Sequence, residues 1–187
     1  MTSCFKGKFK VTSPMGYRTD PITGEKGVYH KGLDLVALGN DKNVYAVADG
    51  VIDAVPYESS GFGRYVRQLL PDGRRIYYAH LKYDSAVVKA GKTVKAGDKL
   101  GVMGSTGKST GNHTHLELRV KGTSKESLDI SAFTGIPNER GVYEANPQSD
   151  IEFVQEKCGF EDKTIDYLCG YTFSVDLFAK IRKAIEG

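Results

Sequence analysis

Four histidines and one aspartate are the residues of this chain best suited to bind a metal and to move protons. The histidines are His30, His80, His113 and His115, and the aspartate is Asp34. Imidazole and carboxylate groups are ligands that zinc accepts, and histidine is the side chain most often used as a general acid or base. Every histidine lies in or beside one of three short motifs, so we expect them to meet in one site.

The first motif is His30-Lys-Gly-Leu-Asp34. On an extended segment, residues 30, 32 and 34 point to the same face. Gly32 has no side chain, which leaves His30 and Asp34 free to converge on one point above it. The spacing predicts a zinc-binding pair, and an ordinary surface turn is the alternative.

The second motif, His113-Thr-His115, places two imidazoles on one face of a predicted strand. One can bind a metal while the other reaches a group bound to that metal, although such pairs also occur without function. Glu117 follows on the same face, and we expect it to be a solvent-facing acid rather than a partner of the site. The glycine-rich stretch before the motif, residues 101–112, lacks the spacing of a phosphate-binding P-loop.

The third motif, Tyr77-Tyr-Ala-His-Leu81, places His80 at the end of a predicted strand. A single histidine in such a position is more often structural. In this chain no histidine lies away from the motifs, which favours a shared function. Three protein ligands with one open position are typical of catalytic zinc sites, and this set leaves two histidines for acid–base work.

Short β-like runs separated by glycine turns surround these motifs and predict a mainly β fold. Their spacing of about ten residues favours an antiparallel sandwich or barrel. Leu70-Pro-Asp-Gly-Arg74 predicts a hairpin with Asp-Gly at its tip. The predicted strands are Gly32–Ala37, Val44–Ala48, Gly50–Pro56, Arg64–Leu70, Arg74–Leu81 and His113–Val120.

The sequence changes character after residue 125. Residues 126–148 are rich in glycine, proline and asparagine and predict a connector. It would join a catalytic domain over residues 1–125 to a small helical module over residues 149–187. Three helices are expected in the module, the last capped by Ser174 with Ile185 facing inward.

Composition and charge limit the classes of function. The 187 residues carry a net charge of +3, are 40% hydrophobic and 26% charged, and include no long apolar run. These values exclude a disordered chain, and no transmembrane helix is expected. Residues 1–147 hold 21 basic and 15 acidic residues, whereas residues 148–187 hold 5 and 8. No arginine-rich patch or aromatic RNA-binding motif accompanies the basic part, so we expect neither a nucleic-acid nor a membrane partner.

The chain contains three cysteines, Cys4, Cys158 and Cys169. Their number is odd and none lies in a Cys-x-x-Cys pair, so we expect three free thiols. Cys158 and Cys169 are expected to pack as small apolar residues in the helical module.

In this order and spacing, the three motifs resemble those of the lysostaphin-type (LytM-domain) zinc endopeptidases. The resemblance covers roughly residues 8–120 and includes Thr12-Ser-Pro-Met-Gly-Tyr-Arg18 and Val94-Lys-Ala-Gly-Asp-Lys-Leu-Gly101. It implies a LytM-like β fold, one Zn²⁺ per chain, and hydrolysis of peptide bonds in the stem or cross-bridge of bacterial peptidoglycan. Members of this family act outside the cytoplasmic membrane.

The resemblance also implies a role for each residue of the site. His30, Asp34 and His115 would hold the zinc. His80 and His113 would be the catalytic pair, with His113 the first choice for the base that deprotonates the attacking water. No covalent intermediate and no cysteine would take part.

The chain departs from the family pattern at two positions that are not ligands. Asn112 stands where the family usually has proline, and Thr114 where it often has a bulky residue. Some relatives use a tyrosine near the site to stabilise the transition state. Tyr17 and Tyr29 are the candidates for that role in this chain.

Two alternative functions compete with hydrolysis. A LytM-like module without catalysis could bind the wall or activate another enzyme, but such relatives lose ligands and this chain keeps all five positions. Val94–Gly101 also resembles the half-motif of biotinyl and lipoyl carrier domains. A carrier domain would need a modified lysine at a hairpin tip and would leave the histidines unexplained.

The cellular setting follows from the first ten residues, which show no apolar signal segment. We expect a phage or prophage lysin that is made in the cytoplasm and reaches the cell wall after holin-dependent release. A secreted enzyme without its signal is the alternative. The helical module would then bind wall polymer, dock on the sheet domain, or form a homodimer.

Overall fold

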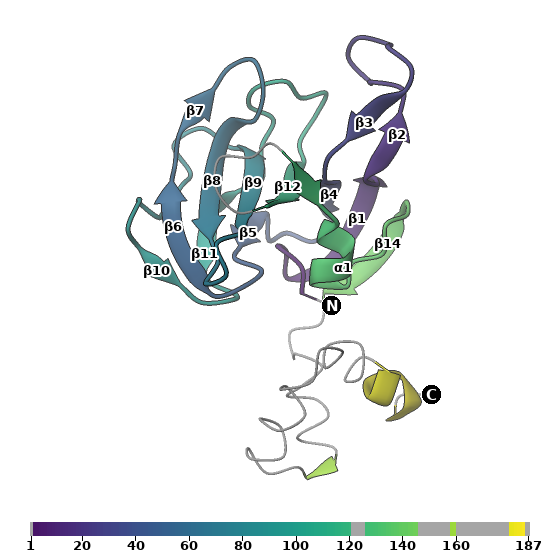
Figure 1. The fold of residues 1–187 in the computed structure, drawn as a ribbon, viewed down its shortest axis with the longest axis vertical. Coiled ribbons are helices and arrows are strands. Elements are labelled where there is room, and N and C mark those ends of the chain that lie inside the picture. Colours follow the sequence, from purple (N-terminus) through teal and green to yellow (C-terminus); the bar gives the residue numbers. More distant parts are fainter. Residues whose placement is uncertain (1, 121–125, 146–157, 160–179, 186–187) are drawn as a thin grey trace. The chain divides into compact units, whose positions relative to one another are not determined.

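The computed structural model describes residues 2–120, 126–145, 158–159 and 180–185. The chain divides into two compact units, Thr2–Ala145 and Asn146–Gly187, the second including Met1. Every strand of the described residues lies in the first unit, drawn in purple to green in Figure 1. This mainly β architecture confirms the predicted fold class. None of the described helices is long and apolar enough to cross a membrane.

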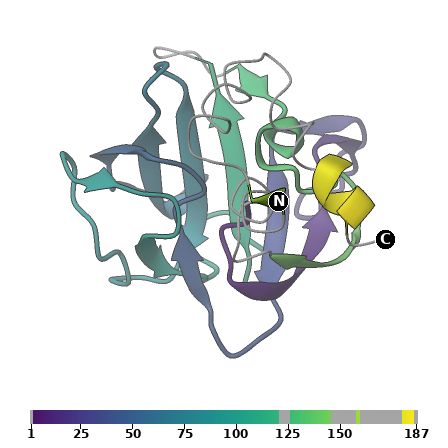
Figure 2. The ribbon, with the colours of Figure 1, turned by 90° about the horizontal axis from the view of Figure 1, so that it is seen from below.

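A large antiparallel sheet forms the body of the first unit. Eight strands follow one another across this sheet, in the order β10 (Thr93–Val94), β6 (Gly50–Ala54), β8 (Gly63–Leu69), β9 (Arg75–Leu81), β12 (Thr114–Arg119), β4 (Leu33–Ala37), β1 (Gly7–Ser13) and β14 (Gly141–Ala145). Two short strands pair at its sides, β7 (Tyr57–Glu58) with β8 and β13 (Ser127–Leu128) with β12. Seen from below, β12 runs between the blue strands and the purple strands (Figure 2).

Two small two-stranded sheets complete the unit. One pairs β5 (Asn43–Tyr45) with β11 (Lys99–Val102), and the other is the hairpin of β2 (Gly16–Arg18) and β3 (Val28–His30). The buried Tyr78 hydroxyl ties β9 to the chain after β5, since it accepts a hydrogen bond from Val47 N at 2.9 Å and donates one to Gln68 Oε1 at 2.7 Å.

The strands predicted from the sequence coincide with β4, β5, β6, β8, β9 and β12, with ends that differ by a few residues. The Asp72-Gly73 tip joins β8 to β9, and Gly73 has a φ of +89°, the left-handed conformation that glycine adopts easily. β1 is not among the predicted strands. The alternation of buried and exposed residues that is typical of a strand is nevertheless present in β1. Phe9, Val11 and Ser13 are buried, and the residues between them are exposed or partly exposed.

The prediction of a connector over residues 126–148 is wrong for the part that the structure describes, residues 126–145. β13 pairs with β12, and β14 pairs with β1 along its whole length. Between them lies α1 (Ile130–Thr134), whose N-cap Asp129 accepts hydrogen bonds from Ser131 N and Ala132 N. The glycines and prolines of this segment separate short elements that belong to the sheet domain.

The described cysteines are free, as expected, but only one of them is packed. Cys4 is fully buried in the sheet domain, whereas Cys158 is exposed, so its expected packing in the helical module is wrong. Cys169 and most of the three expected helices lie outside the described residues. Residues 180–185 are helical, within the third expected helix, but Ile185 is 42% exposed rather than facing inward.

Candidate metal centre

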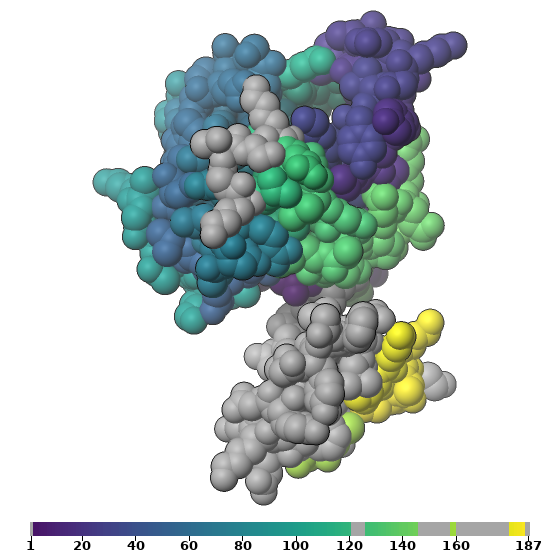
Figure 3. Space-filling view, in the orientation of Figure 1, coloured from purple at the N-terminus to yellow at the C-terminus, as the bar shows by residue number. Residues whose placement is uncertain are grey.

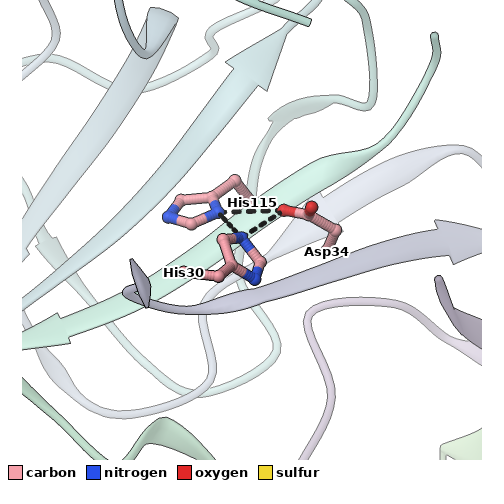
Figure 4. A group of neighbouring side chains, drawn as sticks. All are labelled: His30, Asp34 and His115. Atoms are coloured by element: carbon pink, nitrogen blue, oxygen red, sulfur yellow. Dashed lines mark hydrogen bonds and ion pairs between the residues drawn. The ribbon is translucent and has the colours of Figure 1, made fainter. Parts of the chain in front are cut away.

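Strand pairing brings two of the predicted ligands together. His115 on β12 and Asp34 on β4 are direct cross-strand partners in the register of the main sheet. His30, the last residue of β3, completes the group from the hairpin beside them (Figure 4). All three side chains are buried. The structure thus places the three residues expected to hold zinc around one point.

The three donor atoms that face this point lie close to one another. His30 Nε2 is 3.1 Å from Asp34 Oδ1, His115 Nδ1 is 2.9 Å from the same oxygen, and the two nitrogens are 3.0 Å apart. In tetrahedral zinc sites, ligand atoms at about 2.0–2.1 Å from the metal are about 3.3–3.4 Å from one another. The observed spacing is therefore close to that of a zinc coordination shell.

Outer hydrogen bonds set which nitrogen of each imidazole faces this point. His30 Nδ1–H donates to the carbonyl oxygen of Pro14 at 2.8 Å, and His115 Nε2–H donates to Glu117 Oε2 at 3.1 Å. With a metal in place of the protons between them, His30 Nε2 and His115 Nδ1 would each offer it a lone pair, beside an oxygen of the Asp34 carboxylate. Three such acceptors facing one point are stabilised by a cation between them.

The electrostatics of the group agree with this geometry. Burial alone would raise the pKa of Asp34, but its contacts with His115 and His30 outweigh burial and hold that pKa well below its usual range. Burial would lower the pKa of His115, but Asp34 and Glu117 outweigh it and raise the pKa to about 9. Both shifts show that the donor set stabilises a positive charge, so the residues present fit a divalent metal such as zinc.

The other two histidines lie beside the donor set, and each is held through its Nδ1. His80 Nδ1–H donates to the carbonyl oxygen of Thr106 at 2.8 Å, and His113 Nδ1–H donates to that of Gly111 at 2.8 Å. Their ring centroids are 4.6 Å apart, and His113 Nε2 is 3.6 Å from Asp34 Oδ1. Burial lowers the pKa of His80 to about 4, so this ring is neutral at pH 7 and can accept a proton.

The backbone at His80 explains how a strand residue reaches the site. His80 has a φ of +59°, a conformation that is rare for residues other than glycine, and its N–H donates to Phe62 O at 2.8 Å. The register between β8 and β9 shifts at this end, which is a β-bulge. Bulges redirect side chains and are common next to active sites.

Two charged residues contact the site although the sequence did not indicate them as part of it. Glu117, expected to face solvent, is 1% exposed and bridges His115 to Arg119, whose Nε donates to Glu117 Oε1 at 2.7 Å. Arg18 Nη1 lies 3.1 Å from Asp34 Oδ2 and also donates to Ser13 Oγ. The sequence places Glu117 two residues after His115, on the same face of the strand, and this spacing could have indicated a partner of His115. The burial of Glu117, however, results from strand pairing on both sides of β12.

We expect Glu117 to control the affinity for the metal through His115. Glu117→Gln keeps the shape of the side chain but removes the charge that fixes the proton on His115 Nε2. Loss of such an outer partner costs about 10–100-fold in metal affinity. Competition with a chromogenic zinc chelator measures this change. Glu144→Gln, an exposed glutamate on β14, is the control, and equal zinc affinity in both variants would contradict the role of Glu117.

Gly32 lets the His30–Asp34 motif approach β12. A Cβ atom on Gly32 would lie 2.3 Å from Leu116 O and 3.0 Å from His115 Cε1. Such distances are far below van der Waals contact, so any side chain would push the two segments apart. The glycine is therefore required by a close backbone approach to β12.

Gly32→Ala is expected to weaken both folding and metal binding. Overpacking of this kind costs about 1–3 kcal/mol of unfolding free energy, and at this position it also displaces Asp34 from His115. Thermal unfolding and zinc titration of the same sample measure the two effects. Gly39→Ala is the matched control, since Gly39 is exposed and a Cβ there would meet nothing within 4 Å. A Gly32 variant as stable as this control would refute the close-approach explanation.

The glycines in the stretch before His113 allow backbone segments to pack closely against one another. A Cβ on Gly104 would lie 2.4 Å from Lys82 N, and one on Gly107 would lie 2.3 Å from Gly63 N. This close packing holds the loop between β11 and β12 against the ends of β8 and β9. The carbonyl oxygen of Thr106, within this loop, then accepts the hydrogen bond that orients His80.

A groove opens over the donor set. A hollow of ≈ 210 Å³ is lined by all four histidines and by residues of three loops, including Ile22, Phe62 and Lys108. The segment between β2 and β3 projects at the top of the body in Figures 1 and 3, and β7 lies at the other side of the same end. Tyr17 and Tyr29 form an exposed cross-strand pair on the hairpin and are not among the residues that line this hollow.

Comparison with known proteins gives one matching family and several similar proteins. The model of peptidase family M23 matches residues 28–127. The DD-carboxypeptidase/endopeptidase Mpg of Neisseria meningitidis is 39% identical over 122 residues, which are 65% of this chain and 27% of that protein. The chain spans only 25–27% of the length of the first curated relatives it matches.

Two solved structures share the fold. The catalytic domain of lysostaphin from Staphylococcus simulans superimposes with a TM-score of 0.59 at 31% identity, over 68% of this chain and 92% of that domain. A mutant catalytic domain of the prophage-encoded M23 protein EnpA from Enterococcus faecalis gives a TM-score of 0.55 at 33% identity, over 65% of this chain and 88% of that one.

Proposed function

This chain belongs to peptidase family M23, and on that premise we propose that it is a zinc-dependent endopeptidase that hydrolyses peptide bonds of bacterial peptidoglycan. The observation that carries the proposal is the convergence of His30 Nε2, Asp34 Oδ1 and His115 Nδ1 on one point, with His80 and His113 beside it. The similarity to a DD-carboxypeptidase/endopeptidase and to lysostaphin supports the choice of substrate. A non-catalytic module is not favoured, because all five positions converge.

In this proposal His30, Asp34 and His115 hold the metal. Zinc bound there would supply Lewis-acid polarisation of the scissile carbonyl and of the attacking water. The outer partners of the two ligand histidines, Pro14 O and Glu117, keep their free nitrogens turned to the metal. Arg18 holds the second oxygen of Asp34, which fixes the carboxylate with Oδ1 toward the group.

His113 and His80 move the protons. His113 Nε2, 3.6 Å from Asp34 Oδ1, accepts a proton as the water attacks the peptide carbon. His80, neutral and held by Thr106 O, offers a second nitrogen to orient the water or the intermediate. The leaving amine takes its proton from the histidine that was protonated in the first step, which returns that histidine to its starting state.

Digestion of purified sacculi tests this function. The protein is loaded with zinc and incubated with sacculi of several wall chemotypes, and the released fragments are identified by mass spectrometry. Peptide cleavage that a chelator abolishes and added zinc restores supports the proposal. Release of no peptide fragment from any chemotype, by protein with one zinc per chain, would refute it.

We also propose that the enzyme works as a phage-type lysin. The similarity of its sheet domain to the prophage-encoded EnpA supports this role. Expression of the chain inside bacteria with and without a co-expressed holin tests it. Lysis that depends on the holin supports a lysin that waits in the cytoplasm, and equally fast lysis in both cultures would contradict that role.

A further inference from the structure

A second hollow continues the groove beyond Asp34 and differs in chemistry from the first. It measures ≈ 310 Å³ and shares Arg18, Pro21, Asp34, Thr110 and His113 with the first hollow. Its other wall is polar and includes hydroxyl, amide and guanidinium groups from Thr12, Ser13, Asn112 and Arg140. A substrate lying across the donor set would thus place its two sides in different surroundings.

Arg140 reaches this hollow on a segment that is fixed to the groove wall. The Asn138 side chain clamps the backbone of Met15, since Met15 N donates to Asn138 Oδ1 at 2.8 Å and Asn138 Nδ2 donates to Met15 O at 3.1 Å. The neighbouring carboxylate of Glu139 accepts a hydrogen bond from the Tyr143 hydroxyl at 3.2 Å. The backbone that carries Arg140 is therefore held beside the hollow, and the exposed Arg140 side chain lines it.

Arg18 and Asp34 line both hollows, so the two sides of the groove differ in their other charged residues. In the first hollow, the additional cation Lys108 is paired with Asp20 at 2.9 Å. In the second, the cations are Arg18 and Arg140, and the only acid among the lining residues is Asp34, which belongs to the metal-binding group. A guanidinium offers five N–H donors, and Arg18 uses Nη1 for Asp34 and Ser13, which leaves donors for a ligand.

We propose that this second hollow is a carboxylate subsite, in which Arg140, with Arg18, binds a free carboxylate on the substrate residue next to the scissile bond. This inference rests on the proposed function and specifies its substrate class: peptides with an anionic residue at that position, rather than uncharged glycine bridges. Arginine suits the role because its planar fork pairs with carboxylates through two parallel hydrogen bonds. Arg140 is the residue to test, because changing Arg18 would also disturb Asp34.

The test compares two matched substrates. Muropeptide dimers whose cross-linking diamino acid carries a free carboxylate are hydrolysed in parallel with the same dimers in which that group is a carboxamide. We expect the unchanged enzyme to prefer the carboxylate form by about tenfold in kcat/KM, mainly through KM, as for a charge-assisted hydrogen bond at a partly exposed site. Arg140→Gln should remove most of this preference, Arg140→Lys should retain part of it, and Arg74→Gln, at the β8–β9 turn, should leave it intact.

The outcomes distinguish the subsite from the function. Equal hydrolysis of both dimers by the unchanged enzyme would overturn the subsite and leave the peptidase function standing. A similar loss for both dimers in Arg140→Gln would also overturn it, because a carboxylate subsite acts on one of them only. Hydrolysis of neither dimer by zinc-loaded enzyme that still digests sacculi would exclude this class of substrate, and failure on sacculi as well would refute the function itself.

Discussion

Asp34→Ala is expected to abolish zinc binding and hydrolysis together. Asp34 Oδ1 contacts both ligand nitrogens, at 3.1 Å from His30 and 2.9 Å from His115, so its loss removes the anionic member of the donor set. Lewis-acid polarisation supplies several kcal/mol to such reactions, and a loss of that size lowers the rate by about 1,000-fold or more. Elemental analysis of the purified protein and a peptide-release assay measure the two effects.

A second aspartate provides the control for this variant. Asp53 accepts hydrogen bonds from Arg67 and Arg75 at 2.7 and 2.8 Å, and its side chain is 18% exposed against 12% for Asp34. Asp53→Ala therefore also removes a mostly buried ion-paired carboxylate, but one away from the donor set. We expect it to lose stability and keep its zinc. Full zinc occupancy in Asp34→Ala would contradict the proposed ligand set.

His113→Ala and His80→Ala are expected to keep their zinc and lose turnover. Neither residue belongs to the three-atom donor set, and each lies beside it with its Nδ1 hydrogen-bonded to a backbone carbonyl. General acid–base groups contribute about 10²–10⁴-fold to the rate, so kcat should fall by that factor. Zinc content and kcat on a soluble muropeptide, measured on the same preparations, separate the two properties.

His115→Ala is the control against which the zinc content of these two variants is compared. It removes a donor atom from the metal group, so it should lose zinc as Asp34→Ala does. A loss of zinc in His113→Ala equal to that in His115→Ala would show that the two histidines of this motif have exchanged roles. Normal kcat in either His113→Ala or His80→Ala would remove that histidine from the proton transfers.

The sequence alone identified the four histidines and Asp34 as candidates for the site, together with the local structure around them. All four histidines and Asp34 could be selected because imidazole and carboxylate have a restricted chemistry and occur in three short motifs of this chain. The main strands and the hairpin at Asp72-Gly73 followed from period-two alternation and turn residues, which act between near neighbours in the chain. Each of these signals depends on covalent structure and contacts within a few residues.

Other features were decided by the tertiary structure, because they depend on contacts between distant segments. His30 and His115 are 85 positions apart, and only the pairing of β12 with β4 places His115 opposite Asp34. The same pairing buries Glu117, and a bulge against β8 gives His80 its left-handed backbone. The sequence of residues 126–145 predicted a connector, although this segment contains β13 and β14. These strands are stabilised by hydrogen bonds to β12 and β1, and no local sequence pattern indicates those partners. Strand register is fixed by burial of one face against the rest of the fold, so it becomes determined only when the whole sheet has assembled.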